Sequence, residues 1–418
     1  MSSLLIEGGR RLSGAVEVEG NKNAALPLLA ACLLTDKECV LHNVPRIRDV
    51  EVMAQLLVDL GATVEGIGTT TVRVRCPEVT KDEPDGTLVG RLRGSVLLLG
   101  PLLARRRRAR LAPPGGDFPA RRTISTHLEA LVAMGARVLN EPGHVLECPD
   151  GLKPTSIYLY EASVTGTETA LLAAAAAPGV TEIRHAAQEP HVVELCLFLQ
   201  KLGVGVSGIG SSTIRIEGGA TLGGATHTLW GDYIEAGSWA VVAAITGGEI
   251  DVRGARWEDL EVIATVLKRL HIECGMVGDV FRVEESKPRA AGRITTGLWP
   301  GFPSDLVSLV TVLATQAEGR TLVHDWLYEL RLFALEQLSG MSADLFLCDP
   351  HRIIVTGPRK LRGRPLDSRD LRSGMALIAA ALAADGESRV TPLETVERGY
   401  AQLVDRLRAL GASVTRLG

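Results

Sequence analysis

Polar and charged residues stand at the start of six almost wholly apolar runs along the chain. A run that is apolar on all sides predicts a helix buried inside its domain. The N–H groups and the dipole of a helix N-terminus favour phosphates and carboxylates, so six such ends facing one cleft would bind an anionic substrate. The residues are Lys22 and Asn23; Arg93; Thr165, Thr167 and Glu168; Asp232 and Glu235; Ser304 and Asp305; and Asp370 and Arg372.

A simpler explanation is that these residues only cap their helices, as isolated Ser, Asp and Asn residues often do. That explanation does not cover Lys22, Arg93 or Arg372. A cation at a helix N-terminus is electrostatically unfavourable unless an anion joins it. We therefore expect a dianionic ligand at these ends.

The second run is followed by an insertion, RRRRARLAPPGGDFPARRTISTH, which places Asp117 just after a Pro-Gly turn. A turn of this composition is commonly only a surface feature, but Arg121 and Arg122 follow it directly. Their proximity favours a functional loop. The basic run 105–108 could suggest RNA binding. The acidic chain and the lack of interleaved aromatics favour instead a solvated strand edge, or steering of anionic substrates.

The elements that position these residues belong to a sixfold repeat. A surface helix ends near a small or polar residue, and a short pair of strands follows. The anchor residues are Gly61, Gly135, Gly203, His271, Ser342 and Gly411, at spacings of 74, 68, 68, 71 and 69 residues. Each unit is expected to run strand, buried helix, strand, surface helix, strand, strand (βαβαββ).

Six units exceed one domain, so we expect three in each of two α/β domains. The chain is expected to begin in one domain, build the other, and return. The first domain would hold residues 1–21 and 231–418, and the inserted domain residues 22–230. The active site is expected in the cleft between them.

Composition excludes several classes of protein. The net charge of −4 gives no sign of a nucleic-acid partner. No run is long enough to span a membrane, and the N-terminus does not read as a signal peptide. No P-loop or acidic Mg²⁺ cluster is present, and we expect neither a metal nor a cofactor. Seven scattered cysteines without a C-x-x-C pair predict no disulfide or zinc and a reducing cytoplasm; by pattern all seven should lie in buried elements.

Five motifs carry a resemblance to a known family: EGNKNAALPLLAACLL, PGGD, WPGFPSDL, DLRSGMALIAAALAADG and ERGYAQLVDRLRALGA. They resemble the UDP-N-acetylglucosamine 1-carboxyvinyltransferase family (MurA) over nearly the whole chain. The resemblance implies an enolpyruvyl transferase fold, two inside-out α/β barrels of three repeats each. It also implies transfer of the enolpyruvyl group of phosphoenolpyruvate (PEP) to the 3-hydroxyl of UDP-N-acetylglucosamine, by addition and elimination of phosphate. This is the first committed step of peptidoglycan synthesis.

The same resemblance assigns roles to residues. Lys22 would hold the PEP phosphate, Asp305 would deprotonate the sugar hydroxyl, and Asp117 would be the acid that protonates the PEP methylene. The residues implied around PEP are Lys22, Asn23, Arg121, Arg331, Arg372, Arg398 and Asp370. Those implied around the UDP-sugar are Asn23, Arg93, Arg121, Arg122, Thr123, Ile124, Ser125, Asp305 and Leu327.

The chain departs from the family pattern at two places. Most members have Cys where Asp117 stands, and the members with Asp are active but escape covalent attack by the epoxide fosfomycin. An aspartate acid must hold a proton near neutral pH, against a reference pKa of about 3.9; nearby arginines lower that pKa and a bound PEP dianion raises it. We therefore expect the acid to be competent mainly in the loaded enzyme. The segment 119–122 is also altered, which affects the nucleotide contacts.

Two other functions remain open. The chain could transfer enolpyruvyl to another acceptor, as enzymes acting on shikimate 3-phosphate do, or it could be an inactive homologue with a binding or regulatory role. The presence of the full set Lys22, Asp117, Asp305, Asp370 and Arg398 argues against the inactive homologue. The sequence predicts no oligomeric state.

Overall fold

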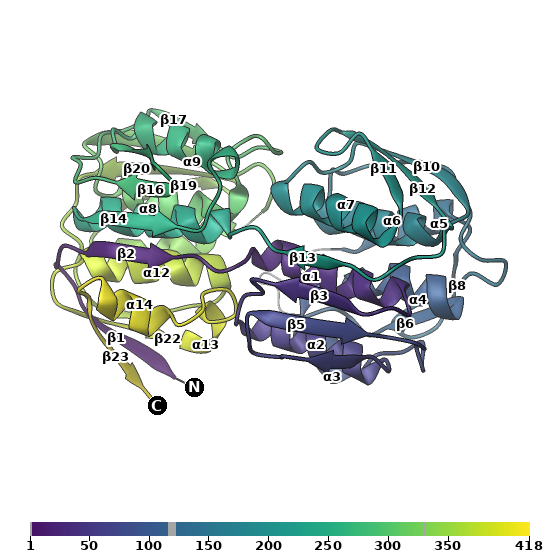
Figure 1. Ribbon diagram of the computed structural model, residues 1–418. Coiled ribbons are helices and arrows are strands. Elements are labelled where there is room, and N and C mark those ends of the chain that lie inside the picture. The colour runs from purple at the N-terminus through teal and green to yellow at the C-terminus, as the bar shows by residue number, and fades with distance from the viewer. Residues whose placement is uncertain (1, 116–122, 330) are drawn as a thin grey trace. The chain divides into compact units, whose positions relative to one another are not determined.

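The computed structural model describes residues 2–115, 123–329 and 331–418. The chain divides into two compact units. The terminal unit comprises Met1–Glu19 and Gly231–Gly418, and the inserted unit comprises Gly20–Trp230. The domain limits expected from the repeats lie within two residues of these limits. Figure 1 labels the helices and strands of each unit.

The terminal unit is built around three buried helices. They are α8 (Tyr233–Thr246), α10 (Val307–Ala314) with its preceding 3₁₀ turn η3 (Ser304–Leu306), and α12 (Leu371–Ala383). The three pack against one another, and nearly all of their side chains are buried. Because they are apolar on all faces, they can be covered on every side by sheets.

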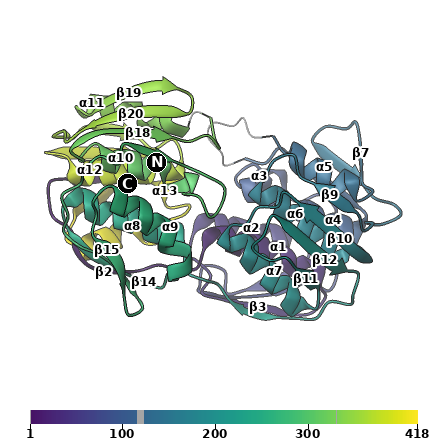
Figure 2. The same cartoon turned by 90° about the horizontal axis from the view of Figure 1, so that it is seen from above.

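Three four-stranded sheets surround these helices. Their strands are β1 (Ser3–Glu7), β2 (Ser13–Glu17), β14 (Glu249–Arg253), β15 (Cys274–Val277), β16 (Val280–Val283), β17 (Arg293–Thr295), β18 (Gly319–His324), β19 (Asp344–Asp349), β20 (Arg352–Gly357), β21 (Pro365–Asp367), β22 (Glu387–Thr391) and β23 (Ser413–Leu417). The sheet orders are β15-β16-β14-β2, β17-β18-β20-β19 and β21-β22-β1-β23. Figure 2 shows α8, α10 and α12 between the sheet of β18–β20 and the strands β2 and β14. This is the inside-out arrangement, with helices at the centre.

The two N-terminal strands, β1 and β2, lie in sheets whose other strands all come after residue 230. Strand β2 lies parallel to β14. Strand β1 lies between β22 and β23 and is antiparallel to both, with Leu4 opposite Val390 on one side and Arg416 on the other. The last sheet therefore depends on a strand from the opposite end of the chain.

The inserted unit repeats this plan with one gap. Its central helices are α1 (Lys22–Ala31), α4 (Leu99–Arg106) after the turn η2 (Arg93–Leu98), and α6 (Val164–Ala176). Its strands are β3 (Cys39–His42), β4 (Thr63–Glu65), β5 (Thr71–Arg75), β6 (Arg108–Leu111), β7 (Arg137–Val138), β8 (His144–Glu147), β9 (Ser156–Tyr158), β10 (Gly179–Arg184), β11 (Gly205–Ser207), β12 (Thr213–Gly218) and β13 (Thr226–Thr228). The sheet orders are β13-β3-β5-β4, β11-β12-β10-β9 and β6-β8-β7. Within the described residues the second repeat thus has three strands, not the four expected from the βαβαββ pattern.

The six anchor residues of the repeat all have left-handed backbones. They follow the surface helices α2 (Arg48–Asp59), α5 (Ser125–Ala133), α7 (Pro190–Leu202), α9 (Trp257–Arg269), α11 (Gln337–Gly340) and α14 (Leu403–Ala409). The φ angles are 104° at Gly61, 99° at Gly135, 104° at Gly203 and 95° at Gly411, and also 60° at His271 and 74° at Ser342. The helix ends expected from the sequence are therefore confirmed, including the two without glycine.

The basic run 105–108 is held by the protein itself. Arg105 donates to the carbonyls of Leu33 (3.0 Å) and Pro77 (2.8 Å). Arg108 pairs with Asp82 (3.5 Å) and Glu141 (3.4 Å). These contacts support the strand-edge interpretation of the run.

Two of the seven cysteines are not buried. Cys348 is exposed on β19 and Cys274 is only partly buried, so the expectation that all seven cysteines are buried is wrong. Cys348 is exposed because alternate side chains of this edge strand face solvent.

None of the described helices is long and apolar enough to cross a membrane.

Candidate active site

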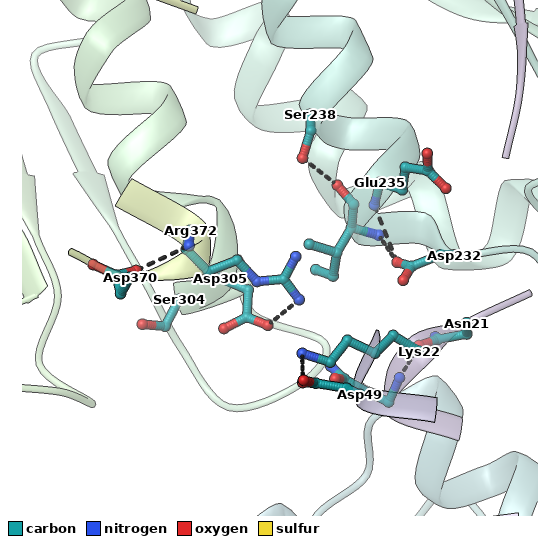
Figure 3. Close-up of polar contacts among 12 residues, drawn as sticks. Asn21, Lys22, Asp49, Asp232, Glu235, Ser238, Ser304, Asp305, Asp370 and Arg372 are labelled. Atoms are coloured by element: carbon teal, nitrogen blue, oxygen red, sulfur yellow. Dashed lines mark hydrogen bonds and ion pairs between the residues drawn. The ribbon is translucent and has the colours of Figure 1, made fainter. Parts of the chain in front are cut away.

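Asp305 in the terminal unit lies between two arginines. Its Oδ1 is 3.0 Å from Nη1 of Arg331. Its Oδ2 is 2.8 Å from Nη2 of Arg372, the contact drawn in Figure 3. The same Nη1 of Arg331 donates to Ser304 Oγ at 2.9 Å, and Ser304 donates to Asp325 at 2.6 Å. The structure thus brings together three residues that the sequence predicted from separate segments. Two guanidinium groups thus share the Asp305 carboxylate, and Asp325 adds a second carboxylate on the Arg331 side.

Both arginines keep their charge despite burial. The side chain of Arg372 is 9% exposed, against 27% for Asp305. Burial lowers the pKa of Arg372, but Asp305, Tyr400 and Asp232 together raise it above its usual range. For Arg331 the lowering by burial is likewise exceeded, chiefly by Asp305 and Asp325, and its pKa is raised. The pair can therefore bind a carboxylate or phosphate at any physiological pH.

A buried tyrosine acts on Arg372. The phenol of Tyr400 lies close to Arg372 and raises its pKa, and the phenol oxygen lies 2.8 Å from Ser238 Oγ. Ser238 donates to the carbonyl of Ile234 at 2.7 Å. A carbonyl can only accept, so Ser238 uses its proton on Ile234 and accepts from the hydroxyl of Tyr400. Burial raises the pKa of Tyr400, which keeps its proton available for this hydrogen bond.

Two acidic residues of this unit do cap helices, as the simpler explanation proposed. Asp370 Oδ1 accepts from the backbone N–H groups of Arg372 (2.9 Å) and Ser373 (3.0 Å). Asp232 caps α8 in the same way. Glu235, in the first turn of α8, accepts from Trp239 and pairs with Arg406. Asp305 makes no such cap.

Two further predicted residues lie in this unit. The backbone N–H of Leu327 donates to Asp325 at 3.3 Å, and Leu327 is partly buried. Arg398 is partly buried between α13 (Leu393–Val396) and Tyr400. Tyr328, close to Leu327, has the guanidinium of Arg331 over its ring at 4.5 Å.

In the inserted unit, Lys22 is paired with a carboxylate that the sequence analysis did not single out. Its Nζ lies 2.7 Å from Asp49 Oδ2, and the two side chains are 12% and 4% exposed (Figure 3). Asn21 caps α1 by accepting from Asn23 N at 2.8 Å. Because Asp49 pairs with Lys22 and Asp305 with Arg372, the charges of these two cations do not by themselves require an external anion, and the dianionic ligand stays a prediction. The protein supplies an anion in both cases.

Part of the predicted UDP-sugar set is also brought together in the inserted unit. Arg93 donates to the carbonyl of Thr123 at 2.7 Å, and the hydroxyls of Thr123 and Ser125 are 2.9 Å apart; Ile124 between them is buried. His127, which the sequence analysis missed, contacts Thr165 Oγ1 through Nε2 at 2.8 Å. Burial, then the charge of Arg93, lowers the pKa of His127 to about 4, so its ring is neutral.

The remaining polar residues at the start of α6 are structural. Thr167 donates to Ser163 O and accepts from Ala187 N. Glu168 is fully buried, and burial and then Glu189 raise its pKa well above the usual range, so it is protonated. Asp117, Arg121 and Arg122 lie outside the described residues. In the part of the chain that is described, no group of three or more His, Cys, Asp or Glu side chains could hold a metal ion.

Comparison with known proteins identifies the family. The chain matches the family model of EPSP synthase (3-phosphoshikimate 1-carboxyvinyltransferase) over residues 6–407, and it therefore belongs to that family. Among solved structures it is similar to the enolpyruvyl transferase NikO from Streptomyces tendae, with a TM-score of 0.90 at 25% identity over 99% of this chain and 98% of that one. EPSP synthase from Acinetobacter baumannii shares the fold, with a TM-score of 0.76 at 18% identity over the full length of both chains. The expected two-domain enolpyruvyl transferase fold is confirmed.

Relatives within the family indicate which of its enzymes this chain resembles. The chain is 42% identical to the UDP-N-acetylglucosamine 1-carboxyvinyltransferase of Bradyrhizobium diazoefficiens, over 99% of this chain and 97% of that protein. It is 40% identical to the enzyme of the same name from Treponema denticola, over 99% of each. The resemblance drawn from the five motifs is confirmed.

Proposed function

We propose that this protein transfers the enolpyruvyl group of PEP to the 3-hydroxyl of UDP-N-acetylglucosamine and releases phosphate, the first committed step of peptidoglycan synthesis. The observation that carries the proposal is the Asp305 carboxylate held between Arg331 and Arg372. A potential base beside two fixed cations suits an alcohol that must lose a proton next to an anionic partner. The names of its full-length relatives supply the acceptor.

In the proposed reaction, Asp305 takes the proton of the sugar hydroxyl as its oxygen attacks C2 of PEP. Asp117 protonates the methylene carbon, which becomes a methyl group, and the resulting tetrahedral adduct then loses phosphate together with one proton of that methyl group. Arg331 and Arg372 would bind the PEP carboxylate, and Asp370 would lie beside Asp305. Lys22 and Asn23 would bind the phosphate end of PEP, and Arg121 and Arg398 would line the phosphate path. Residues of both units would thus act on the same pair of substrates.

The UDP-sugar would be bound mainly by the inserted unit. Arg93, Arg121, Arg122 and the segment Thr123–Ser125 are proposed to contact it, with Leu327 and Asp305 of the terminal unit. The contact of Arg93 with Thr123 supports this grouping because it ties two predicted nucleotide-binding segments together. We place the reaction in the cytoplasm, where free cysteines such as the exposed Cys348 stay reduced.

A second acceptor deserves a direct test because the matching family model is that of the shikimate 3-phosphate enzymes. Phosphate release from PEP should be measured with UDP-N-acetylglucosamine and, separately, with shikimate 3-phosphate. We expect release only with the UDP-sugar. Release only with shikimate 3-phosphate would replace the proposed acceptor, and release with neither would favour an inactive homologue. The Asp305→Asn variant is the control for turnover at this site.

A further inference from the structure

Asp325 is a buried carboxylate of the terminal unit that none of the assignments above includes. It follows directly on strand β18 and is 0% exposed. Its backbone N–H donates to the carbonyl of His351 at 2.8 Å, and Nδ1 of His351 donates to the carbonyl of Asp325 at 2.7 Å, since a carbonyl can only accept. Strand β20 begins directly after His351. The sheet that contains β18 and β20 therefore fixes the backbone of Asp325.

Among the described residues, three donors converge on the two carboxylate oxygens of Asp325. Oδ1 accepts from Oγ1 of Thr296 at 2.7 Å and from the backbone N–H of Leu327 at 3.3 Å. Oδ2 accepts from Oγ of Ser304 at 2.6 Å. A buried charge costs free energy unless hydrogen bonds satisfy it, and here both oxygens accept. Asp325 thus connects the loop after β18 to the end of β17 and to the start of η3.

The proton of Ser304 has a fixed direction. Nη1 of Arg331 donates to Ser304 Oγ at 2.9 Å, and an arginine can only donate. Ser304 therefore accepts from Arg331 and gives its own proton to Asp325. The same Nη1 lies 3.0 Å from Oδ1 of Asp305. Asp325 thereby orients, through Ser304, the guanidinium group that faces the proposed base.

We propose that Asp325 is a positioning residue for PEP, which acts through Ser304 to hold Arg331 where it binds the PEP carboxylate. This inference rests on the proposed function, which places Arg331 at PEP and Leu327 at the UDP-sugar. The hydrogen bonds toward these two residues leave from different oxygens of Asp325. Oδ2 serves the PEP side and Oδ1 serves the nucleotide side, so a change at one oxygen should affect one substrate.

Asp325→Asn tests this division with little change in volume. An amide nitrogen donates and does not accept. With the remaining oxygen toward Thr296 and Leu327, the variant leaves only the proton of Ser304 without an acceptor, whereas the flipped amide would leave two donors without one. Since hydrogen bonds to charged groups are the stronger ones, we expect the KM for PEP to rise roughly tenfold. The KM for UDP-N-acetylglucosamine should stay unchanged, as measured by steady-state phosphate release.

Two further variants show whether the effect passes through Ser304. Ser304→Ala removes the link between Asp325 and Arg331 and should also raise the KM for PEP. In the Ser304→Ala background, Asp325→Asn should add little, because residues of one network are not additive. Thr296→Val is the matched control. It removes a buried hydrogen bond to the other oxygen of Asp325, so it should lower the stability of the protein and leave the KM for PEP unchanged.

A purely structural role of Asp325 gives a different pattern. It predicts that Asp325→Asn raises both KM values alike, or that its effect is fully additive with that of Ser304→Ala, and either result would overturn the inference. If Asp325→Asn does not fold, the two other variants decide. A KM for PEP raised in Ser304→Ala and not in Thr296→Val supports the inference, and equal values in both contradict it.

Failure of the proposed function can be told apart from failure of this inference. If the wild-type protein uses shikimate 3-phosphate and not the UDP-sugar, the proposed acceptor is wrong, and the KM for PEP measured with shikimate 3-phosphate still tests Asp325. If neither acceptor supports turnover, calorimetric titration with PEP replaces the kinetic assay. PEP affinity that is the same in the wild type and in Asp325→Asn would then refute the positioning role.

Discussion

The two units balance the charges of their buried cations in different ways. In the terminal unit, the carboxylate proposed as the catalytic base is itself the counter-ion of Arg331 and Arg372. In the inserted unit, the counter-ion of Lys22 is Asp49, a nearly fully buried residue that has no proposed role with the substrates. In the terminal unit, Asp305 is therefore both the counter-ion and the proposed catalytic base. In the inserted unit, Asp49 is only a counter-ion. Substitutions that affect one function without the other can test this difference.

The largest expected effect concerns Asp117 of the inserted unit. Fosfomycin should leave the wild-type enzyme active, because opening an epoxide needs a strong nucleophile such as a thiolate and a carboxylate is far weaker. Asp117→Cys should be active and should lose all activity after preincubation with the drug. Residual activity and intact mass are the measurements, made in a Cys348→Ser background because Cys348 is exposed. Inactivation of the wild type with one adduct would contradict the role of Asp117, and so would a resistant, active Asp117→Cys variant.

Asp305→Asn should have the next largest effect. It removes both the base and the carboxylate that Arg331 and Arg372 share, so kcat should fall by roughly 10²-fold or more. Asp49→Asn is the matched substitution in the inserted unit. It should change the KM for PEP through Lys22 and lower kcat much less, as measured by steady-state phosphate release. If Asp305→Asn loses less than about threefold in kcat, the base lies elsewhere and the general-base contribution assumed here is absent.

Tyr400→Phe tests whether the terminal unit needs Arg372 to be fixed as well as charged. The variant removes the phenol oxygen close to the buried guanidinium of Arg372, a loss of about 1–2 kcal/mol, so the KM for PEP should rise roughly tenfold. The KM for UDP-N-acetylglucosamine should not change. Ser238→Ala keeps the Tyr400 oxygen in place and should have a smaller effect.

A double variant checks that Tyr400 acts through Arg372. In the Arg372→Lys background, Tyr400→Phe should add little, because residues in one network are not additive. Full additivity in the KM for PEP would show that Tyr400 affects the enzyme through stability alone.

The two units should also respond to pH with opposite sign. The pKa of His127 in the inserted unit is lowered from 6.5 to about 4, mainly by burial. The unfolded chain then binds more protons between these values, so this contribution to stability is lost as pH falls from 6.5 to 4. Burial raises the pKa of Glu235 in the terminal unit from 4.5 to about 7. Its contribution is therefore complete below pH 4.5 and is lost as pH rises to 7.

Urea unfolding across this pH range can separate the two contributions. His127→Gln should remove the loss of stability in acid, and Glu235→Gln should remove the loss toward neutral pH, each by an amount on the order of 2 kcal/mol. The readout is the slope of the unfolding free energy against pH. Slopes unchanged from the wild type would show that neither group titrates in this range.

The smallest expected effect compares two anchor residues, one in each unit. Ser342 has a φ of 74° and is exposed, so Ser342→Gly should stabilise the protein by up to about 1 kcal/mol. Gly203 has a φ of 104° and a Cβ added there would meet nothing within 4 Å, so Gly203→Ala should destabilise by about 1 kcal/mol through backbone strain alone. Chemical denaturation measures both. Effects of equal sign would mean that the repeat does not depend on left-handed anchors.

The repeat could be predicted because its signals are local. A helix that ends at a left-handed residue shows itself through glycine spacing, and His271 and Ser342 could be located only because the other four anchors fixed the period. Within the described residues the second repeat has three strands where the βαβαββ pattern predicts four. The exposure of Cys348 was missed because an edge strand reads like a buried one in sequence.

Site residues that belong to the family motifs could be predicted from the sequence. Their hydrogen-bond and ion-pair partners were missed where only the tertiary structure brings them close. Asp305, Arg331 and Arg372 were expected together and lie together. Asp49 and Tyr400 were not expected, because an aspartate at the start of a surface helix and a tyrosine in an apolar core have ordinary local explanations. The counter-ions of Lys22 and Arg372 come from separate segments, so sequence alone could not exclude an external anion.

The position of β1 at the centre of the last sheet has a consequence for synthesis. Its two neighbours, β22 and β23, are the last strands to be made, so β1 must wait for almost the entire chain before it can pair. The inserted unit has all of its strands once residue 230 has emerged and can fold first. During that interval an apolar strand remains without its partners, and such strands are prone to aggregate. The inserted unit can therefore fold before the N-terminal strand β1 is paired, and β1 stays without its neighbours until the C-terminal strands have been made.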